Sequence, residues 1–346
     1  MDFPGEKLVI KLWETLTEKG IGSLLSPWQL GREGRARTEV RQHEVLMLAQ
    51  AETDAADIRA GRKHLRSDGV LLLTNLPQST DPRPRMKLAL TLVDAANYGA
   101  RTAAATAART EINASKAILF AEDQLAADSQ NPPAGNIDED WLFAWRENAG
   151  KVSAEDLQRL WGSVLAGEIK APGKYSIRTL EFLKTLSKQE AELISQLASY
   201  VIDGRIARAQ KTYLDSKGLT FSRLLMMQEL GVLSGVEAIG LSTTYTSIAP
   251  HKFTRALVSH GKALIIEHED SSKALKIEIY MLTAVGRQVL GLGSFEPDVE
   301  YMRLVAKDIL KQGFTAKLSD WRDISESQGE YFNAQDILGD APIAEV

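Results

Sequence analysis

The chain has 346 residues, of which 25% are charged and 44% apolar, and it contains no cysteine. This composition is typical of a folded globular protein of about two domains, and it excludes wholesale disorder. The missing cysteines exclude disulfides, cysteine-ligated zinc, iron–sulfur clusters and a thiol nucleophile, and they favour a cytoplasmic location. A net charge of −5 gives no overall attraction to nucleic acid or to anionic lipid.

Residues 1–130 predict an extended helical region. Residues 1–30 fit a short amphipathic helix that carries Leu8, Leu12 and Leu16, followed by a loop rich in glycine and proline. Residues 31–66 are rich in Arg, Glu, Ala and Gln with a thin apolar stripe, which predicts a long exposed helix or coiled-coil arm. A second long helix is expected from about Arg85 to Ala127, where small residues would let helix backbones pack closely.

No signal peptide and no transmembrane helix are expected. Asp2 and Glu6 stand where a signal peptide would need an apolar core. The apolar runs Val70–Leu73 and Leu88–Val93 are too short to span a membrane. Docking of Leu24, Leu25 and Trp28 onto the protein body is favoured, while peripheral membrane contact through them stays an alternative.

Residues 137–210 predict a compact helical module behind a linker rich in proline and asparagine, Ser129–Asp140. The first helix should bury Trp161 and end at Pro172-Gly173. Helix N-caps are expected at three serines: Ser153, Ser176 and Ser187.

The string from Leu160 to Ile194 resembles a bacterial family of uncharacterised proteins, DUF2806. The shared pattern is Leu-Trp…Leu-Ala-Gly-Glu, a Pro-Gly turn and then Ser-x-Arg-Thr-Leu. The resemblance implies no activity, because the family has none to carry over. The motif residues of unassigned role are Trp161, Glu168, Pro172, Gly173, Ser176 and Arg178.

Two interpretations of this motif are open. Glu168 could act as a general base while Arg178 grips an anion. Alternatively, Glu168 and Arg178 form an ion pair that fixes the angle between two helices, with Trp161 packed in the core. The second interpretation is favoured, because an isolated Glu–Arg pair is common in structural turns and no histidine lies nearby.

Residues 211–346 predict an α+β module with helices over about 219–232, 282–293 and 296–311 and a partly packed tail. Thr283 should cap the second of these helices. The order of helix, hairpin and Leu-Thr-x-x-Gly is similar to winged-helix domains, so the expected fold class is mainly α with a C-terminal winged-helix-like module. The predicted strands are Phe253–Ser259, Ala263–His268 and Leu275–Leu282.

A winged-helix-like module raises the question of DNA binding. The candidate nucleic-acid contacts are Arg223, Lys252, Arg255 and Lys262. The expected recognition helix offers only Arg223 and Gln228 to a groove, so protein contact is favoured over DNA contact.

No metal and no cofactor are expected. The five histidines lack metal-ligand spacing, and the cluster Glu267–Asp270 fits a solvated hairpin turn. Phosphate-binding glycine loops and a Gly-x-Ser-x-Gly elbow are missing from the sequence, so an enzymatic role is disfavoured. The leading hypothesis is a bacterial interaction or scaffold protein that self-associates through its N-terminal helices and binds protein partners. The alternative is a DNA-binding protein.

Overall fold

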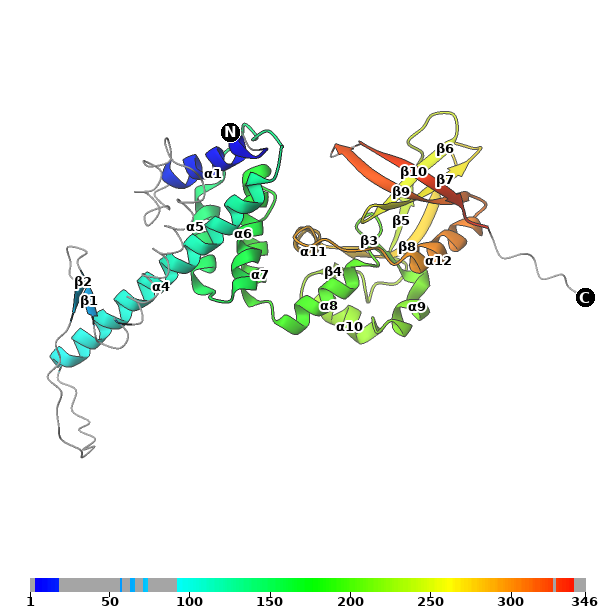
Figure 1. Ribbon diagram of the computed structural model, residues 1–346. Helices are drawn as coiled ribbons and strands as arrows, with labels where there is room; N and C mark the ends of the chain where they lie inside the picture. Colours follow the sequence, from blue (N-terminus) through cyan, green and yellow to red (C-terminus); the bar gives the residue numbers. More distant parts are fainter. Residues whose placement is uncertain are drawn as a thin grey trace, which may run out of the picture. The chain divides into compact units, whose positions relative to one another are not determined.

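The computed structural model describes residues 4–18, 57, 63–65, 71–73, 92–325 and 328–338. Contacts divide the chain into two compact units, a helical unit (Met1–Leu180) and a sheet unit (Glu181–Val346), both drawn in Figure 1. The boundary falls inside residues 137–210, which the sequence suggests as one module. In the described part of the chain, no helix has the length and apolar character that a membrane crossing requires.

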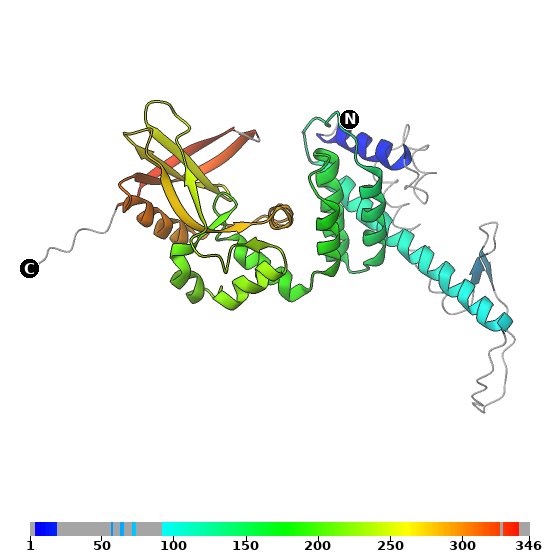
Figure 2. The same ribbon diagram turned by 180° about the vertical axis from the view of Figure 1, so that it is seen from behind.

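The helical unit is built on one long helix, α4 (Leu92–Ala126). Two shorter helices, α5 (Glu139–Lys151) and α6 (Glu155–Lys170), pack side by side on its C-terminal half (Figure 1, Figure 2). Helix α1 (Glu6–Glu18) contacts both α4 and α6. Strands β1 (Lys63–Leu65) and β2 (Leu71–Leu73) form a two-stranded antiparallel sheet that contacts α4. Helix α7 (Ile177–Thr185) reaches the boundary of the unit.

Glycines let the helices of this unit approach closely. A Cβ at Gly162 of α6 would lie 2.7 Å from the Phe120 Cβ and 2.9 Å from the Ala117 carbonyl oxygen, both on α4. The indole of Trp145 on α5 donates to the backbone oxygen of Trp161 on α6 at 2.9 Å. Around these contacts lies a core of fully buried aliphatic side chains, among them Leu8, Leu12, Leu16, Ile118, Leu125 and Leu142.

The sheet unit contains two four-stranded antiparallel sheets. One has the order β10-β9-β7-β6, and in the other β8 pairs with β3, β4 and β5. The strands are β3 (Arg205–Ala207), β4 (Leu233–Ser234), β5 (Ser242–Tyr245), β6 (Phe253–Ser259), β7 (Lys262–His268), β8 (Leu275–Leu282), β9 (Thr315–Ser325) and β10 (Gln328–Asp336).

Helices flank these sheets, and α12 packs on β9 (Figure 1). The rings of Phe253 on β6 and Phe314 pack edge to face with centroids 4.8 Å apart. The buried hydroxyl of Tyr301 on α12 accepts the N–H of Ala207 on β3 at 2.6 Å, which joins the helix to the second sheet. The helices are α8 (Lys188–Ala198), η1 (Arg208–Gln210), α9 (Lys211–Ser216), α10 (Phe221–Glu229), α11 (Ala284–Leu290) and α12 (Val299–Leu310).

The predicted fold class, mainly α with a winged-helix-like module, is wrong. Helices make up 50% and strands 20% of the structure, with two sheets in the C-terminal part. The three predicted strands form as β6, β7 and β8, but they do not make one wing. Strand β7 pairs with β9, which follows α12, whereas β8 belongs to the other sheet. The predicted hairpin of β6 and β7 is confirmed, whereas the inclusion of β8 in the same wing is wrong.

Strands β9 and β10 are not predicted from the sequence, and their exposure explains why. Ala316 and Leu318 of β9 are buried, but residues 322–324 in the second half of that strand are exposed. Strand β10 is exposed along nearly its whole length, so it lacks the period-two apolar pattern by which a half-buried strand is recognised. Its backbone pairing with β9, and not its own burial, defines it as a strand.

Most of the expected N-terminal arm (31–66) and the segment around Trp28 lie outside the described residues. Where the arm is described near its end, Lys63–Leu65 is a strand and not helix, because the apolar run Leu71–Leu73 provides its cross-strand partner. The second expected helix is confirmed as α4, while residues 85–91 lie outside the described part.

Two of the predicted helix caps, Ser187 and Thr283, are confirmed, and Ser153 is not a cap. Ser187 forms a full capping box with Glu190, and Thr283 caps α11 by accepting the N–H of Gly286, both as predicted. Ser153 is not an N-cap, because α6 begins after Ala154. The Ser153 hydroxyl instead accepts a hydrogen bond from the Arg109 guanidinium of α4 at 2.7 Å.

Candidate functional site

The motif that resembles the family forms the turn between α6 and α7. Glu168, in the last turn of α6, is only 1% exposed. Its Oε1 accepts the N–H of Gly173 at 2.5 Å and its Oε2 accepts the N–H of Tyr175 at 2.9 Å. Gly173 has a φ of +86°, a left-handed conformation that glycine adopts without strain. One carboxylate thus fastens the end of α6 to the loop that follows; we call residues 168–176 the Glu168 turn.

Burial sets the electrostatics of the Glu168 turn. Burial raises the pKa of Glu168, although the N–H groups of Tyr175 and Gly173 and the nearby Lys174 act in the opposite direction. Burial and the Glu168 charge raise the pKa of the Tyr175 hydroxyl to about 12. The Tyr175 ring lies against Gly167, where a Cβ would come within 2.6 Å of it, so the turn is closely packed.

The remaining motif residues serve the same turn and its helices. Trp161 is 2% exposed and lies in the core of the helical unit, and Pro172 approaches Gly135 in the preceding linker. The Ser176 hydroxyl accepts the N–H of Thr179 at 3.3 Å, which confirms it as a cap of α7.

Glu168 and Arg178 are not brought together as an ion pair. Arg178 is exposed on α7, whereas both carboxylate oxygens of Glu168 face backbone N–H groups inside the turn. A general base must reach a substrate proton, and an almost fully buried carboxylate bound by two N–H groups is poorly placed for that. The geometry assigns Glu168 a role in shaping the turn.

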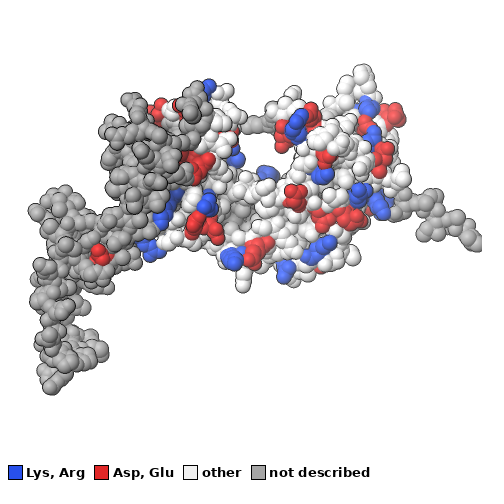
Figure 3. Space-filling model, viewed as in Figure 1, with Lys and Arg blue, Asp and Glu red and all other residues white. Residues whose placement is uncertain are grey.

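Three of the four candidate nucleic-acid contacts are bound by groups of the protein itself. Arg223 donates to the carbonyl oxygen of Gly218 at 2.8 Å. Lys252 forms a salt bridge with Glu267, whose pKa it lowers, and Lys262 forms one with Asp320 at 2.5 Å. On the described surface in Figure 3, Lys and Arg likewise stand beside Asp and Glu. These residues do not form the continuous basic stripe that backbone binding of DNA requires.

The fourth candidate, Arg255 on β6, lies in a cluster that the sequence did not reveal. The guanidinium carbons of Arg255 and of Arg205 on β3 lie 5.3 Å and 5.4 Å from the ring centre of Tyr245 on β5. Arg205 also forms a salt bridge with Asp203 at 2.8 Å. We call these four residues the arginine–tyrosine cluster. The one sequence signal for it is the dipeptide Asp203-Gly204, which is typical of a tight turn.

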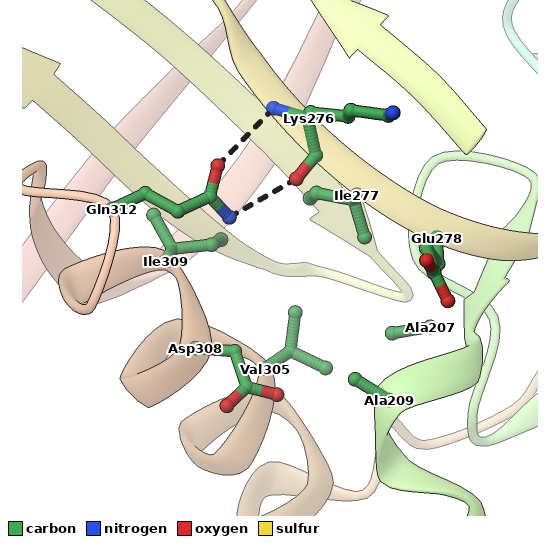
Figure 4. Close-up of a pocket in the computed structure, with 9 residues that line it drawn as sticks. All are labelled: Ala207, Ala209, Lys276, Ile277, Glu278, Val305, Asp308, Ile309 and Gln312. Atoms are coloured by element: carbon green, nitrogen blue, oxygen red, sulfur yellow. Dashed lines mark hydrogen bonds between the residues drawn. The ribbon is translucent and has the colours of Figure 1, made fainter. Parts of the chain in front are cut away.

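Figure 4 shows a hollow of about 190 Å³ between β8, η1 and α12. Two of its polar side chains are engaged: Gln312 pairs with the backbone N–H and carbonyl of Lys276 at 3.3 and 3.0 Å, and Asp308 binds Lys311 at 2.8 Å. Gln312 and Asp308 therefore hold the fold together, and the lining also includes the side chains of Lys276 and Glu278. The apolar residues of the lining are Ala207, Ala209, Ile277, Val305 and Ile309.

Histidines and carboxylates do not gather into a metal centre in the described residues, where no group of three or more could hold an ion. The cluster Glu267–Asp270 ends strand β7. There Asp270 accepts the backbone N–H of Ser272 at 2.8 Å, as in a solvated turn.

Fold and motif together define a two-unit protein with helices in one part and antiparallel sheets in the other. A family model described as a protein of unknown function, DUF2806, matches residues 101–306, which is more than half of the chain. The chain therefore belongs to the DUF2806 family, as the motif in the Glu168 turn predicts. No curated protein and no solved structure matches it.

Proposed function

We propose that this chain is a non-enzymatic interaction protein that self-associates through the N-terminal half of α4. Its lack of cysteine supports a reducing compartment such as the cytoplasm as its place of action. The observation that carries the proposal is the length of α4. Its 35 residues extend about 52 Å, whereas the 16 residues of α6 extend about 24 Å.

The contacts of α4 with its covering helices concentrate in its second half. Arg109 binds Ser153, Glu111 binds Arg146 at 2.5 Å, and further along Phe120 meets Gly162. The N-terminal half runs clear of α5 and α6 in both views of the helical unit (Figure 1, Figure 2). One side of this half is already covered, since Ala105 is buried and β1 contacts α4. Packing of a helical face supplies most of the stability of a helix in a protein, which favours a partner for the side that is exposed.

The residues of this half suit close contact between helices. Ala100, Ala103 and Ala107 are exposed and lie on one side of the helix. A Cβ at Gly99 would meet no atom within 4 Å. Small side chains let two backbones approach closely, so a second copy of α4 is the occupant that this face fits best.

The geometry of the basic residues supports this choice over the alternative of DNA binding. Arg223, Lys252 and Lys262 already bind groups of the protein, so they offer less charge to phosphates. Counterion release on DNA depends on the number of phosphates that free cations neutralise.

Self-association is tested by charge substitution on the exposed alanine side. Ala103→Glu combined with Ala107→Glu should convert an oligomer into a monomer, because two buried carboxylates would face each other across the interface. The measurement is molar mass by light scattering after size-exclusion chromatography. Glutamate is a good helix former, so the helical circular dichroism should not change.

The matched control is Thr102→Glu combined with Thr106→Glu, since both threonines are exposed on a neighbouring side of the same turns. This control should keep the wild-type mass. A monomeric wild-type protein, or a control that dissociates as readily as the alanine variant, would contradict the proposal.

A further inference from the structure

The arginine–tyrosine cluster is built around a tight turn next to β6. Asp203 and Gly204 have φ values of +50° and +70°, and Ile202 pairs with Arg205 across them, as in a two-residue hairpin turn. The N–H of Asp203 donates to the carbonyl oxygen of Val258 on β6 at 2.7 Å. The turn therefore holds the Asp203 carboxylate and the base of Arg205 against the strand that carries Arg255.

Tyr245 is the centre of the cluster. Its side chain is 5% exposed, and the Asp203 carboxylate lies near its hydroxyl. Burial, followed by the charge of Asp203, raises the pKa of this hydroxyl, so the ring stays neutral at physiological pH. Both guanidinium groups lie within cation–π distance of the ring.

The charges of this cluster do not balance. Arg205 is paired with Asp203, to whose carboxylate and backbone oxygen it donates. Among the residues that the structure describes, Arg255 forms no salt bridge and no hydrogen bond, and its Nε is buried without an acceptor. A buried donor of a charged group that lacks an acceptor is costly, because it has lost its hydration without replacement. Arg255 as a whole is half-buried, and its two Nη groups, unlike Nε, are not enclosed without a partner, so they are the donors left for a ligand.

We propose that the arginine–tyrosine cluster is a binding site for a small oxyanion, a phosphate or a carboxylate group, that Arg255 holds. A guanidinium binds such an anion through two parallel N–H donors, and Arg255 has its donors free for this. Arg205 contacts the same ring, but Asp203 balances its charge. The cluster therefore has one uncompensated positive charge, that of Arg255, which a single anionic group would neutralise. The site goes beyond the proposed self-association, which uses the helical unit.

The test measures anion binding by the full-length protein directly. Line broadening of inorganic phosphate in phosphorus NMR, and saturation transfer to acetate in proton NMR, are recorded at constant ionic strength. We expect saturable binding of at least one of the two anions, and the tighter one identifies the chemical source. Arg255→Gln should weaken that binding about tenfold or more, because a charged hydrogen-bonding partner is lost.

Arg223→Gln is the matched control, since it removes an exposed arginine of the same unit and should leave the affinity unchanged. Arg255→Lys keeps the charge without the planar pair of donors, so its binding should fall between the wild type and Arg255→Gln. That variant also decides the matter if Arg255→Gln does not fold. Binding of neither anion to the wild type, or equal binding by the wild type and the Arg255 variants, would overturn the proposal.

Discussion

At the scale of single residues, Glu168 shows what a motif residue can do without catalysis. Its carboxylate accepts the N–H groups of two residues that follow within the next seven positions, and it lies almost entirely out of solvent. Residue types alone suggested Arg178 as its partner, because opposite charges at short spacing are the visible signal. Backbone N–H groups carry no such signal in a sequence. The sequence therefore indicates Glu168 as a motif residue but does not predict that the backbone of Gly173 and Tyr175 is its partner.

Burial of Glu168 predicts a particular dependence of stability on pH. The folded-state pKa lies above the ordinary value of 4.5, so the folded protein binds this proton more tightly than the unfolded chain. The stabilisation that protonation gives is complete below pH 4.5 and is lost as the pH rises through the folded-state pKa. The free energy of unfolding of the wild type, relative to Glu168→Gln, should fall over that window by about 1.4 kcal/mol per unit of raised pKa.

Urea unfolding at pH 4.5 and at pH 7.5 measures this difference. Glu155→Gln, which removes an exposed carboxylate of the same helix, controls for the loss of one negative charge. A difference that grows with pH would mean that the two N–H groups outweigh the burial of the carboxylate.

At the scale of elements, the contact between α4 and α6 depends on the missing side chain of Gly162. Gly162→Ala should destabilise the protein by about 1–3 kcal/mol, because the new methyl group would overlap Phe120 and the Ala117 carbonyl. Gly99→Ala on α4 is the matched substitution, since a Cβ there meets no atom of the same chain; in the Ala103→Glu and Ala107→Glu background, which removes self-association, it should stabilise by about 0.5–1 kcal/mol. Denaturant titration of both variants checks the pair, and equal effects of the two substitutions would contradict this account of the helix contact.

Elements with their own apolar period could be predicted from the sequence, and those defined by pairing could not. Helix α12 and strands β6 to β8 carry buried side chains at helical or alternating spacing, and they form where that spacing places them. Strand β10 carries almost none, and the short strand β3 is recognisable only through its pairing with β8. The arginine–tyrosine cluster joins the predictable strand β6 to β3 and β5, and no local pattern indicates that these three strands meet.

At the scale of the whole molecule, the division into two units predicts two unfolding transitions. Tyr301→Phe leaves the buried N–H of Ala207 without its acceptor and should cost the sheet unit about 1–3 kcal/mol. Gly162→Ala should act on the helical unit alone. In scanning calorimetry each variant should lower one transition, by about 2–4 °C per kcal/mol lost, and leave the other in place.

A single transition that both variants lower equally would show instead that the two units unfold as one cooperative body. The wild-type scan is the reference for both variants, and agreement of the calorimetric with the van't Hoff enthalpy within each transition checks that each unit is two-state.

The irregular end of strand β10 has a consequence for solubility. This strand ends the order of its sheet, and it exposes the side chains of Tyr331 and Phe332. A flat, regular strand in that position would template the stacking of copies into fibrils. Asn333, with a φ of +55° and its amide bound to Asp320 at 2.8 Å, interrupts the register between Phe332 and Gln335. A bulge bends its strand out of the plane that cross-β polymers require, so we expect this irregularity to oppose edge-to-edge pairing through the exposed aromatic side chains.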